Sequence, residues 1–384
     1  MVMMREDRLA VLRIVLFSAI TPLALLVSPV LTGQLIRQYG LAPNQAGTYF
    51  LFELGGLSLA SLPALWWMRR YPPRRVALVA AILFIIANLV SALVVSLPLL
   101  YAVRLLAALA GGTLMVLCMS MAARNSRSDR IFGLWVMGQL VLGAIGLALL
   151  PRLFAVFGLP AFFILAAALM AAVLPLAAGF PDLPMPRRSE SAIPPGTKTG
   201  PGWPVVMIAM VALCSYYIAI GGSWSFMTVI GQMAGVDSLR AADTVAVASL
   251  FGIAGAGGAS LLGGRLPRWS LLVTGFAILA GALLLLAVFP AAAFLPAAIL
   301  FKFAWTFALP PVLAVIGDQD TDGAIMSWSN LVIGAGNVLG PMAGGWMLGR
   351  YGSSLMLGAE ISFVGLSFLL MLVLVLRSKR RGPR

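Results

Sequence analysis

The sequence predicts an all-α membrane protein with twelve transmembrane helices in two pseudo-symmetric six-helix bundles. Three observations carry this prediction: the composition, the number of long apolar segments, and one long polar segment near the middle of the chain. Of the 384 residues, 61% are hydrophobic and only 10% are charged, and the mean hydropathy is +1.02. Soluble domains carry roughly 25% charged residues, so this chain is too apolar to present a water-facing surface, and lipid is the solvent that suits it.

A helix needs about 20 apolar residues to cross the hydrocarbon core. Helices are expected rather than isolated strands, because strands would leave backbone groups unpaired in lipid. The first segment, 10–33, is expected to be a retained helix, because its apolar run is longer than that of a signal peptide. The predicted spans are 10–33, 44–67, 76–97, 99–121, 131–151, 158–180, 204–232, 242–264, 269–289, 292–316, 324–348 and 354–376.

The basic residues indicate how the helices are oriented, because loops on the cytoplasmic side carry an excess of Lys and Arg. The side that holds both termini has 20 of the 26 basic residues: Arg5, Arg8, Arg13, Arg69, Arg70, Arg74, Arg75, Arg124, Arg127, Arg130, Arg187, Arg188, Lys198, Arg265, Arg268, Arg377, Lys379, Arg380, Arg381 and Arg384. The opposite side has four: Arg37, Arg152, Arg240 and Arg350. We therefore expect a multi-pass protein of a bacterial inner (plasma) membrane with both termini in the cytoplasm.

The longest polar stretch divides the chain into two halves. It is rich in Pro, Gly and Ser, which is typical of a linker. The predicted organisation is a six-helix bundle over 1–180, a cytoplasmic linker over 181–203, a second six-helix bundle over 204–376, and a basic cytoplasmic tail over 377–384.

The two halves share landmarks. Arg104 lies early in the fourth segment and Lys302 lies early in the tenth, and each follows a basic turn after the second helix of its half. Repeated halves are typical of transporter folds. Small residues recur at every fourth position in several segments, for example Gly336, Gly340 and Gly344, a spacing that lets helices approach closely in lipid.

Over nearly its whole length the chain resembles the major facilitator superfamily. The segment 65–75, LWWMRRYPPRR, occupies the place of that family's G-x-x-x-D-R-x-G-R-R loop and keeps the basic residues without the Gly and Asp. The segment 104–112, RLLAALAGG, is similar to the family's R-x-x-x-G-x-x-x-G region, which often supports proton coupling. The segment 336–345 resembles the end of the antiporter signature, although in drug/proton antiporters that signature lies in the fifth helix.

The resemblance implies a secondary active transporter that works by alternating access. It also implies that the first, fourth, seventh and tenth helices line a central cavity. Arg104 and Lys302 would then be two cations that face this cavity from opposite halves.

A charge at the membrane centre costs at least about 2.5–3.5 kcal/mol, so each such residue needs a reason. Glu53 and Arg104 lie about nine and six residues from the same ends of their spans, roughly 14 Å and 9 Å deep at 1.5 Å per residue. These depths predict that the two side chains can pair, whereas Asp243 and Glu360 lie nearer helix ends and are weaker candidates for a proton carrier. Two interpretations stay open: a static ion pair that locks two helices, and a proton-coupling site in which Glu53 takes up and releases a proton while Arg104 stabilises its charged form.

No acidic residue is expected in the core of the tenth segment. A buried lysine without a fixed partner either loses its proton or binds an anion, and we therefore expect Lys302 to bind an anionic substrate such as a small carboxylate. The alternative is that Lys302 reaches to the membrane interface.

The seventh segment is expected to break at Gly221-Gly222, with polar and aromatic residues clustered around the break. Together with neighbouring segments it supplies the remaining candidates for substrate contact. The predicted substrate-binding residues are Arg104, Lys302, Tyr216, Tyr217, Trp224, Trp305, Gln139, Asn330 and Asn337.

The sequence also excludes several function classes. It contains no histidine, which rules out histidine metal sites and His-dependent catalytic triads. We expect no enzyme activity, no cofactor, no resident metal and no nucleic-acid partner, and we expect a monomer that binds a small molecule and protons within the lipid bilayer. The main alternative is a proton-driven exporter of hydrophobic drugs or lipids. Less favoured alternatives are a copper transporter that uses the sulfur cluster around Cys118, and a non-transporting sensor.

Overall fold

The computed structural model describes residues 2–123, 128–183, 203–263, 265–319 and 324–380. The described residues are almost entirely helical, with one isolated bridge between Gly263 and Leu266. Most of the predicted linker, 184–202, and the end of the predicted basic tail lie outside the described residues. Chain contacts divide the protein into two compact units: the first comprises Met1–Gln38 with Tyr49–Ser191, and the second comprises Tyr39–Thr48 with Ala192–Arg384.

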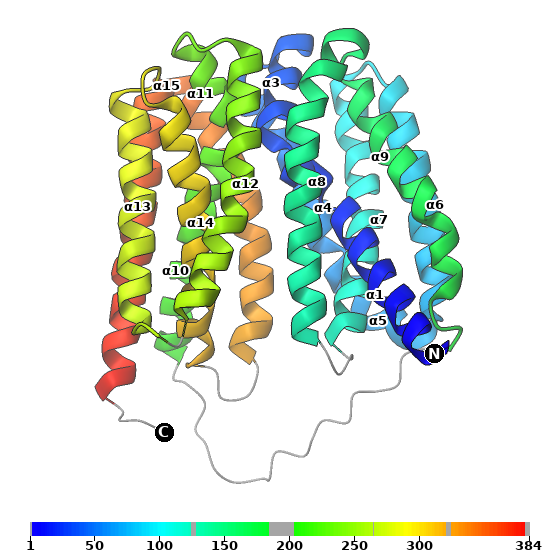
Figure 1. The fold of residues 1–384 in the computed structure, drawn as a ribbon. Helices are drawn as coiled ribbons and strands as arrows, with labels where there is room; N and C mark the ends of the chain where they lie inside the picture. Colours follow the sequence, from blue (N-terminus) through cyan, green and yellow to red (C-terminus); the bar gives the residue numbers. More distant parts are fainter. Residues whose placement is uncertain (1, 124–127, 184–202, 264, 320–323, 381–384) are drawn as a thin grey trace. The chain divides into compact units, whose positions relative to one another are not determined.

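The first unit is a bundle in which α6 packs against α7 and α9, and α1 packs against α7 and α8. Figure 1 shows these helices as long rods that run up and down the bundle. Its elements are α1 (Val2–Ile20), α2 (Leu23–Leu26), α3 (Ser28–Tyr39), α4 (Pro43–Leu59), α5 (Ser61–Arg70), α6 (Pro73–Leu93), α7 (Leu97–Ala123), α8 (Ser128–Phe157), α9 (Pro160–Val173) and the 3₁₀ helix η1 (Leu174–Gly179).

The second unit is a bundle in which α10 packs closely along α15, and α14 packs against α12 and α13. The start of α4 belongs to this unit, and Pro43 lies directly against Gly345 of α15. Its other elements are α10 (Trp203–Ser225), α11 (Met227–Met233), α12 (Ser238–Leu262), α13 (Arg268–Val288), α14 (Phe294–Gly317) and α15 (Ala324–Arg380).

Twelve membrane-crossing segments account for these elements. Within the described ranges, nine helices are long and apolar enough to cross a membrane, and the last of them is two helices merged across Gly352. Gly352 has a φ of 82°, a conformation that glycine adopts without a steric penalty. The first two crossings are missing from the nine because each is broken into shorter helices.

The prediction of unbroken helices over 10–33 and 44–67 was therefore wrong in detail. The first crossing consists of α1, α2 and α3, and the second consists of α4 and α5. Pro22 and Pro29 lie at the breaks of the first, and Pro63 lies three residues after the break at Ala60. Proline lacks an N–H and clashes with the carbonyl four residues earlier, which interrupts a helix.

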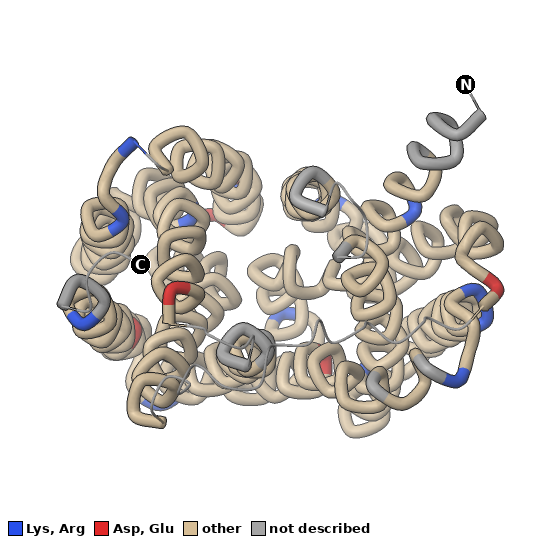
Figure 2. Tube along the Cα trace, turned by 90° about the horizontal axis from the view of Figure 1, so that it is seen from below, with Lys and Arg blue, Asp and Glu red and all other residues tan. Residues whose placement is uncertain are grey.

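Charged residues are sparse in both units, and most of the chain trace in Figure 2 is uncharged. Four charged side chains are nevertheless buried among the described residues: Glu53, Arg104, Lys302 and Glu360. Burial of a charge is costly without compensation, so the surroundings of these four residues define the candidate functional sites.

Candidate functional site

Glu53 of α4 and Arg104 of α7 form a bidentate ion pair inside the first unit. Arg104 Nε donates to Glu53 Oε2 at 2.6 Å, and Arg104 Nη2 donates to Glu53 Oε1 at 2.7 Å. Both side chains are almost fully buried, with 1% of Arg104 and 6% of Glu53 exposed. Two parallel charge-assisted bonds of this kind are short and geometrically specific, so the pair predicted from sequence depth is present.

Polar and aromatic neighbours complete the surroundings of the guanidinium. Arg104 Nη1 donates to Asn88 Oδ1 at 2.8 Å and to Ser91 Oγ at 3.4 Å, both from α6. The ring of Phe163 in α9 lies 5.0 Å from Arg104 Cζ. Tyr49 is buried close enough to interact electrostatically with both charges, although its hydroxyl makes no hydrogen bond among the described residues.

Small residues on α4 and α7 bring the pair together. A Cβ on Gly56 would lie 2.7 Å from Ala108 Cβ and 3.0 Å from the Leu105 carbonyl oxygen, and a Cβ on Gly112 would clash with the Leu57 carbonyl. The two helix backbones therefore touch along this line. Glu53 and Arg104 lie about one turn before Gly56 and Ala108, which places their side chains opposite each other.

This geometry bears on the expectation that Arg104 faces a central cavity. Its guanidinium makes four hydrogen bonds to side chains of the first unit. Arg104 therefore points into its own bundle in this structure, and direct contact with a substrate would require some of these bonds to break.

Lys302 of α14 is the buried cation of the second unit, with 6% of the residue exposed. Its Nζ lies 3.7 Å from the centroid of the Trp305 ring and 4.2 Å from that of Trp224. Its side-chain stem packs against Gly252 of α12, where a Cβ would lie 3.3 Å from Lys302 Cγ. Lys302 is held inside the bundle, so the alternative that it reaches the membrane interface does not describe this structure.

The two indole rings belong to a larger aromatic cluster, comprising Trp224, Phe301 and Trp305. Trp224 is stacked on Phe301 with centroids 6.3 Å apart, and Trp305 meets Trp224 edge-on at 6.0 Å. Cation–π contacts of this kind attract an ammonium group, by about 2 kcal/mol or more when it is desolvated. They do not replace a carboxylate partner, and within the described part of the chain Lys302 has none.

Two polar groups of α10 are buried without a partner among the described residues, and one of them belongs to Trp224, whose ring contacts Lys302. Trp224 Nε1 and Ser223 Oγ make no hydrogen bond among the described residues. A buried donor without an acceptor costs about 1–3 kcal/mol, so such groups are expected to meet a ligand or water. The second unit thus gathers one cation and two unsatisfied polar groups on α10 and α14.

The remaining predicted substrate-binding residues fall into different environments. Tyr216 is fully buried and its hydroxyl donates to the Trp305 carbonyl oxygen at 2.7 Å, so it braces the aromatic cluster. Tyr217 packs its Cβ region against Gly336 of α15, and Gln139 donates to the Ser18 carbonyl oxygen within the first unit. Asn337 of α15 is half-buried near Gly221. The side chain of Asn330 lies outside what the structure describes.

The predicted helix break at Gly221-Gly222 was wrong. Helix α10 runs through both glycines to Ser225, and the interruption falls at Phe226, four residues later. Gly222 serves close packing instead: a Cβ there would clash with Glu360 Oε1 and lie 2.9 Å from the Gly340 carbonyl oxygen. We call the recess formed by Gly222, Gly340 and Gly344 the glycine notch.

Glu360 fills the glycine notch and was underestimated from the sequence. It was expected near a helix end, but only 2% of it is exposed, and its Oε2 makes no hydrogen bond among the described residues. Gly340 and Gly344 were predicted as packing positions and Gly222 as part of a helix break, and the sequence does not show which side chain enters the space between them. Asn88 and Ser91 were also missed, because single polar residues in an apolar segment give little signal.

No group of three or more His, Cys, Asp or Glu side chains that could hold a metal ion occurs within the described residues. Cys118, around which the sulfur cluster was expected, is fully buried in α7.

Comparison with known families decides the class of protein. The Major Facilitator Superfamily matches residues 12–321, which is most of the chain. The protein belongs to the Major Facilitator Superfamily. It is accordingly a transporter of a small solute and not an enzyme, and the twelve helices in two bundles are the fold of that superfamily.

Solved structures share this fold at low sequence identity. The nucleoside transporter NupG is 12% identical with a TM-score of 0.70, over 95% of this chain and 99% of that one. A bacterial homologue of the human lysosomal transporter Spinster, inward-facing and unoccupied, is 16% identical with a TM-score of 0.71, over 97% and 98%. The POT family transporter PepTSo is 14% identical with a TM-score of 0.72, over 97% and 99%. No curated protein sequence matches the chain.

Proposed function

We propose that this member of the superfamily carries a small organic anion across the bacterial inner membrane, coupled to protons, by alternating access with both termini in the cytoplasm. The observation that carries the anion proposal is Lys302, a buried cation between two indole rings with no acidic partner among the described residues. An anionic group supplied by the substrate would compensate its charge.

The groups around Lys302 support an anion over a cation. An anion brings acceptor oxygens that the Nε1 donor of Trp224, unpaired among the described residues, needs. The aromatic cluster offers flat apolar surface for the rest of the molecule. A substrate with one carboxylate and a planar or apolar body matches this combination best.

Proton coupling is proposed for the buried carboxylates. Glu53 has both oxygens bound to Arg104, so release of a proton by Glu53 would accompany the forming of this pair and uptake would accompany its opening. Glu360 is the second candidate, because its Oε2 is buried without a hydrogen-bond partner among the described residues. A carboxyl in such surroundings is suited to carry a proton.

The alternative is export of hydrophobic drugs or lipids, and the aromatic cluster of the second unit is compatible with it. The two proposals differ in the ligand that the protein binds. We would screen the purified protein for thermal stabilisation by organic acids, amines and neutral drugs at pH 5.5 and 7.5, because a bound ligand stabilises the folded state by mass action.

The anion proposal expects stabilisation by one class of organic acid, weakened in the Trp224→Phe variant, which keeps an aromatic ring but removes the Nε1 donor. Loss of one neutral hydrogen bond of about 0.5–1.5 kcal/mol corresponds to roughly threefold to tenfold weaker binding. Stabilisation by hydrophobic cations or neutral drugs alone would overturn the anion proposal and support export.

A further inference from the structure

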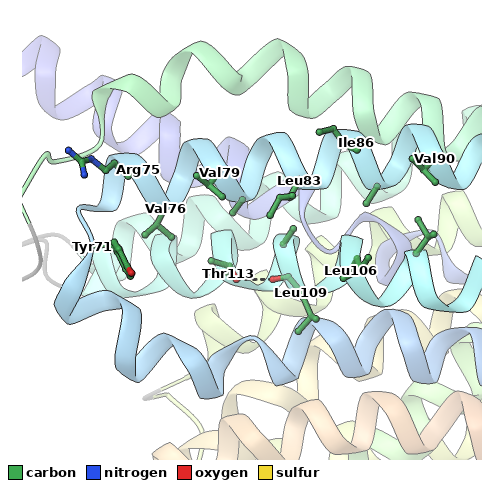
Figure 3. A pocket seen from close by; sticks show the side chains of 14 residues that line it. Tyr71, Arg75, Val76, Val79, Leu83, Ile86, Val90, Leu106, Leu109 and Thr113 are labelled. Atoms are coloured by element: carbon green, nitrogen blue, oxygen red, sulfur yellow. Dashed lines mark hydrogen bonds between the residues drawn. The ribbon is translucent and has the colours of Figure 1, made fainter.

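A groove on the outer face of the first unit is separate from both buried clusters. It lies between α6 and α7, has a volume of about 570 Å³, and includes Tyr71 at the end of α5. Figure 3 shows its lining side chains following α6 from Arg75 to Val90, with Leu106, Leu109 and Thr113 contributed by α7. All of these residues belong to one unit.

Alternation of small and large residues creates the groove. The alanines at 80, 87 and 110 are buried and form its floor. The walls are large apolar side chains such as Val79, Leu83 and Leu106, each more than half exposed. A row of alanines between such walls leaves room for a narrow apolar molecule along the helix.

The polar groups of the groove gather at one end. Apart from Arg75 and Tyr71, Thr113 is the only polar residue among the described residues that line the groove, and its hydroxyl is already bound to the Leu109 carbonyl oxygen at 2.8 Å. Arg75 and Tyr71 both lie at the end of the groove where α6 begins (Figure 3). Arg74 is paired with Asp182 at 2.8 Å, whereas exposed Arg75 has no acidic partner within the described part of the chain.

The length of the groove suits a lipid chain. Val76 and Val90 are 14 residues apart, which corresponds to roughly 21 Å along a helix at 1.5 Å per residue. One leaflet of the hydrocarbon core is roughly 15 Å thick, half of about 30 Å. The apolar part therefore covers the depth of one leaflet, with the free guanidinium at one end.

We propose that this groove binds an anionic phospholipid, with one acyl chain along α6 and α7 and the phosphate at Arg75. Basic groups at the ends of transmembrane helices attract acidic head groups, and Tyr71 lines the same end of the groove. The site does not depend on the proposed substrate or on proton coupling.

Native mass spectrometry of the purified full-length protein would test this directly. Equal amounts of phosphatidylglycerol and phosphatidylcholine with identical acyl chains would compete, and inorganic phosphate would be added in a separate arm. We expect phosphatidylglycerol to bind about fivefold more tightly, the effect of roughly 1 kcal/mol for one basic residue near the surface. Arg75→Gln would abolish this preference, and Arg265→Gln, a matched change at an exposed arginine of the second unit, would leave it intact.

A second variant tests the acyl chain separately. Ala87→Phe fills the floor of the groove and should weaken binding of both lipids, whereas Ala155→Phe adds the same bulk on an exposed face of α8 and should weaken neither. The lipid ratio is read from folded protein only, so a drop in yield does not confound the result. Equal binding of both lipids to the unaltered protein would overturn the proposal, as would full displacement of the lipid by phosphate together with no effect of Ala87→Phe.

Discussion

Glu53 and Arg104 meet through two parallel hydrogen bonds of 2.6 and 2.7 Å in the interior of the first bundle, and Asn88 binds the same guanidinium at 2.8 Å. Removal of one member leaves an uncompensated buried charge, which typically costs about 3–5 kcal/mol. Replacement of both by neutral groups removes the two charges together. Comparing the stability loss of the double variant with the losses of the two single variants therefore measures the interaction free energy between the two side chains.

We therefore expect Arg104→Gln and Glu53→Gln each to lower the free energy of unfolding strongly. The double variant should lower it by much less than the sum of the two single effects. Unfolding of the detergent-purified protein by heat or denaturant measures these values as a double-mutant cycle. Additive losses would show that the two side chains do not stabilise the fold as a pair.

The two adjacent glycines of α10 should differ sharply in their tolerance of a methyl group. A Cβ at Gly222 would clash with Glu360 Oε1 and crowd the Gly340 carbonyl, whereas a Cβ at Gly221 would meet nothing closer than 3.5 Å. We expect Gly222→Ala to lower thermal stability markedly and Gly221→Ala to leave it unchanged or raised, since alanine is the better helix former by up to about 1 kcal/mol.

Partial recovery of Gly222→Ala by a second change, Glu360→Ala, would identify the carboxyl as the group that clashes. Equal stability of Gly221→Ala and Gly222→Ala would contradict the claim that the glycine notch has no room for a methyl group at position 222.

Proton coupling through Glu360 predicts a specific defect. The Glu360→Gln variant keeps the side-chain volume and removes the exchangeable proton, so it should still exchange substrate across proteoliposomes. It should fail to accumulate substrate when a pH gradient is imposed. Accumulation driven by the gradient at the level of the unaltered protein would exclude Glu360 as the proton carrier, and the same assay on Glu53→Gln tests the other carboxylate.

Much of the fold follows from the sequence, because membrane insertion imposes simple rules. The length of the apolar segments, and the need to pair backbone hydrogen-bonding groups in lipid, predict twelve helices. The distances of Glu53 and Arg104 from the ends of their spans predict that the two side chains can meet. The breaks after Ile20 and Leu59 and at Phe226 were not predicted, since proline and local packing shift a break by a few residues from where composition suggests it.

The site was predicted less completely than the fold. Lys302 and Trp224 were named as neighbours of a substrate, but the sequence does not reveal that the lysine lies between two indole rings. Glu360 was misjudged because its depth was counted from an expected helix end, whereas its burial is set by glycines on α10 and on the preceding part of α15. Such contacts between distant segments carry no periodic signal.

Orientation in the membrane remains a prediction that one experiment can check. The sequence places 20 basic residues on the side of the membrane that holds both termini and four on the opposite side. This bias predicts that both termini are in the cytoplasm. A fluorescent reporter that matures only in the cytoplasm, fused after Arg384, should be bright, and a periplasm-specific enzyme at the same place should be inactive. The reverse pattern would invert the assigned topology.

The central claim is that Lys302 binds the anionic group of the substrate. Its most direct test is calorimetric binding of the stabilising organic acid to the unaltered protein and to Lys302→Gln, Lys302→Arg and Lys379→Gln. Hydrogen bonds to charged groups contribute about 1.5–3 kcal/mol, so we predict at least roughly tenfold weaker binding for Lys302→Gln. Binding should recover in part for Lys302→Arg and stay unchanged for Lys379→Gln. Equal affinity of the acid for the unaltered protein and for Lys302→Gln would contradict the account.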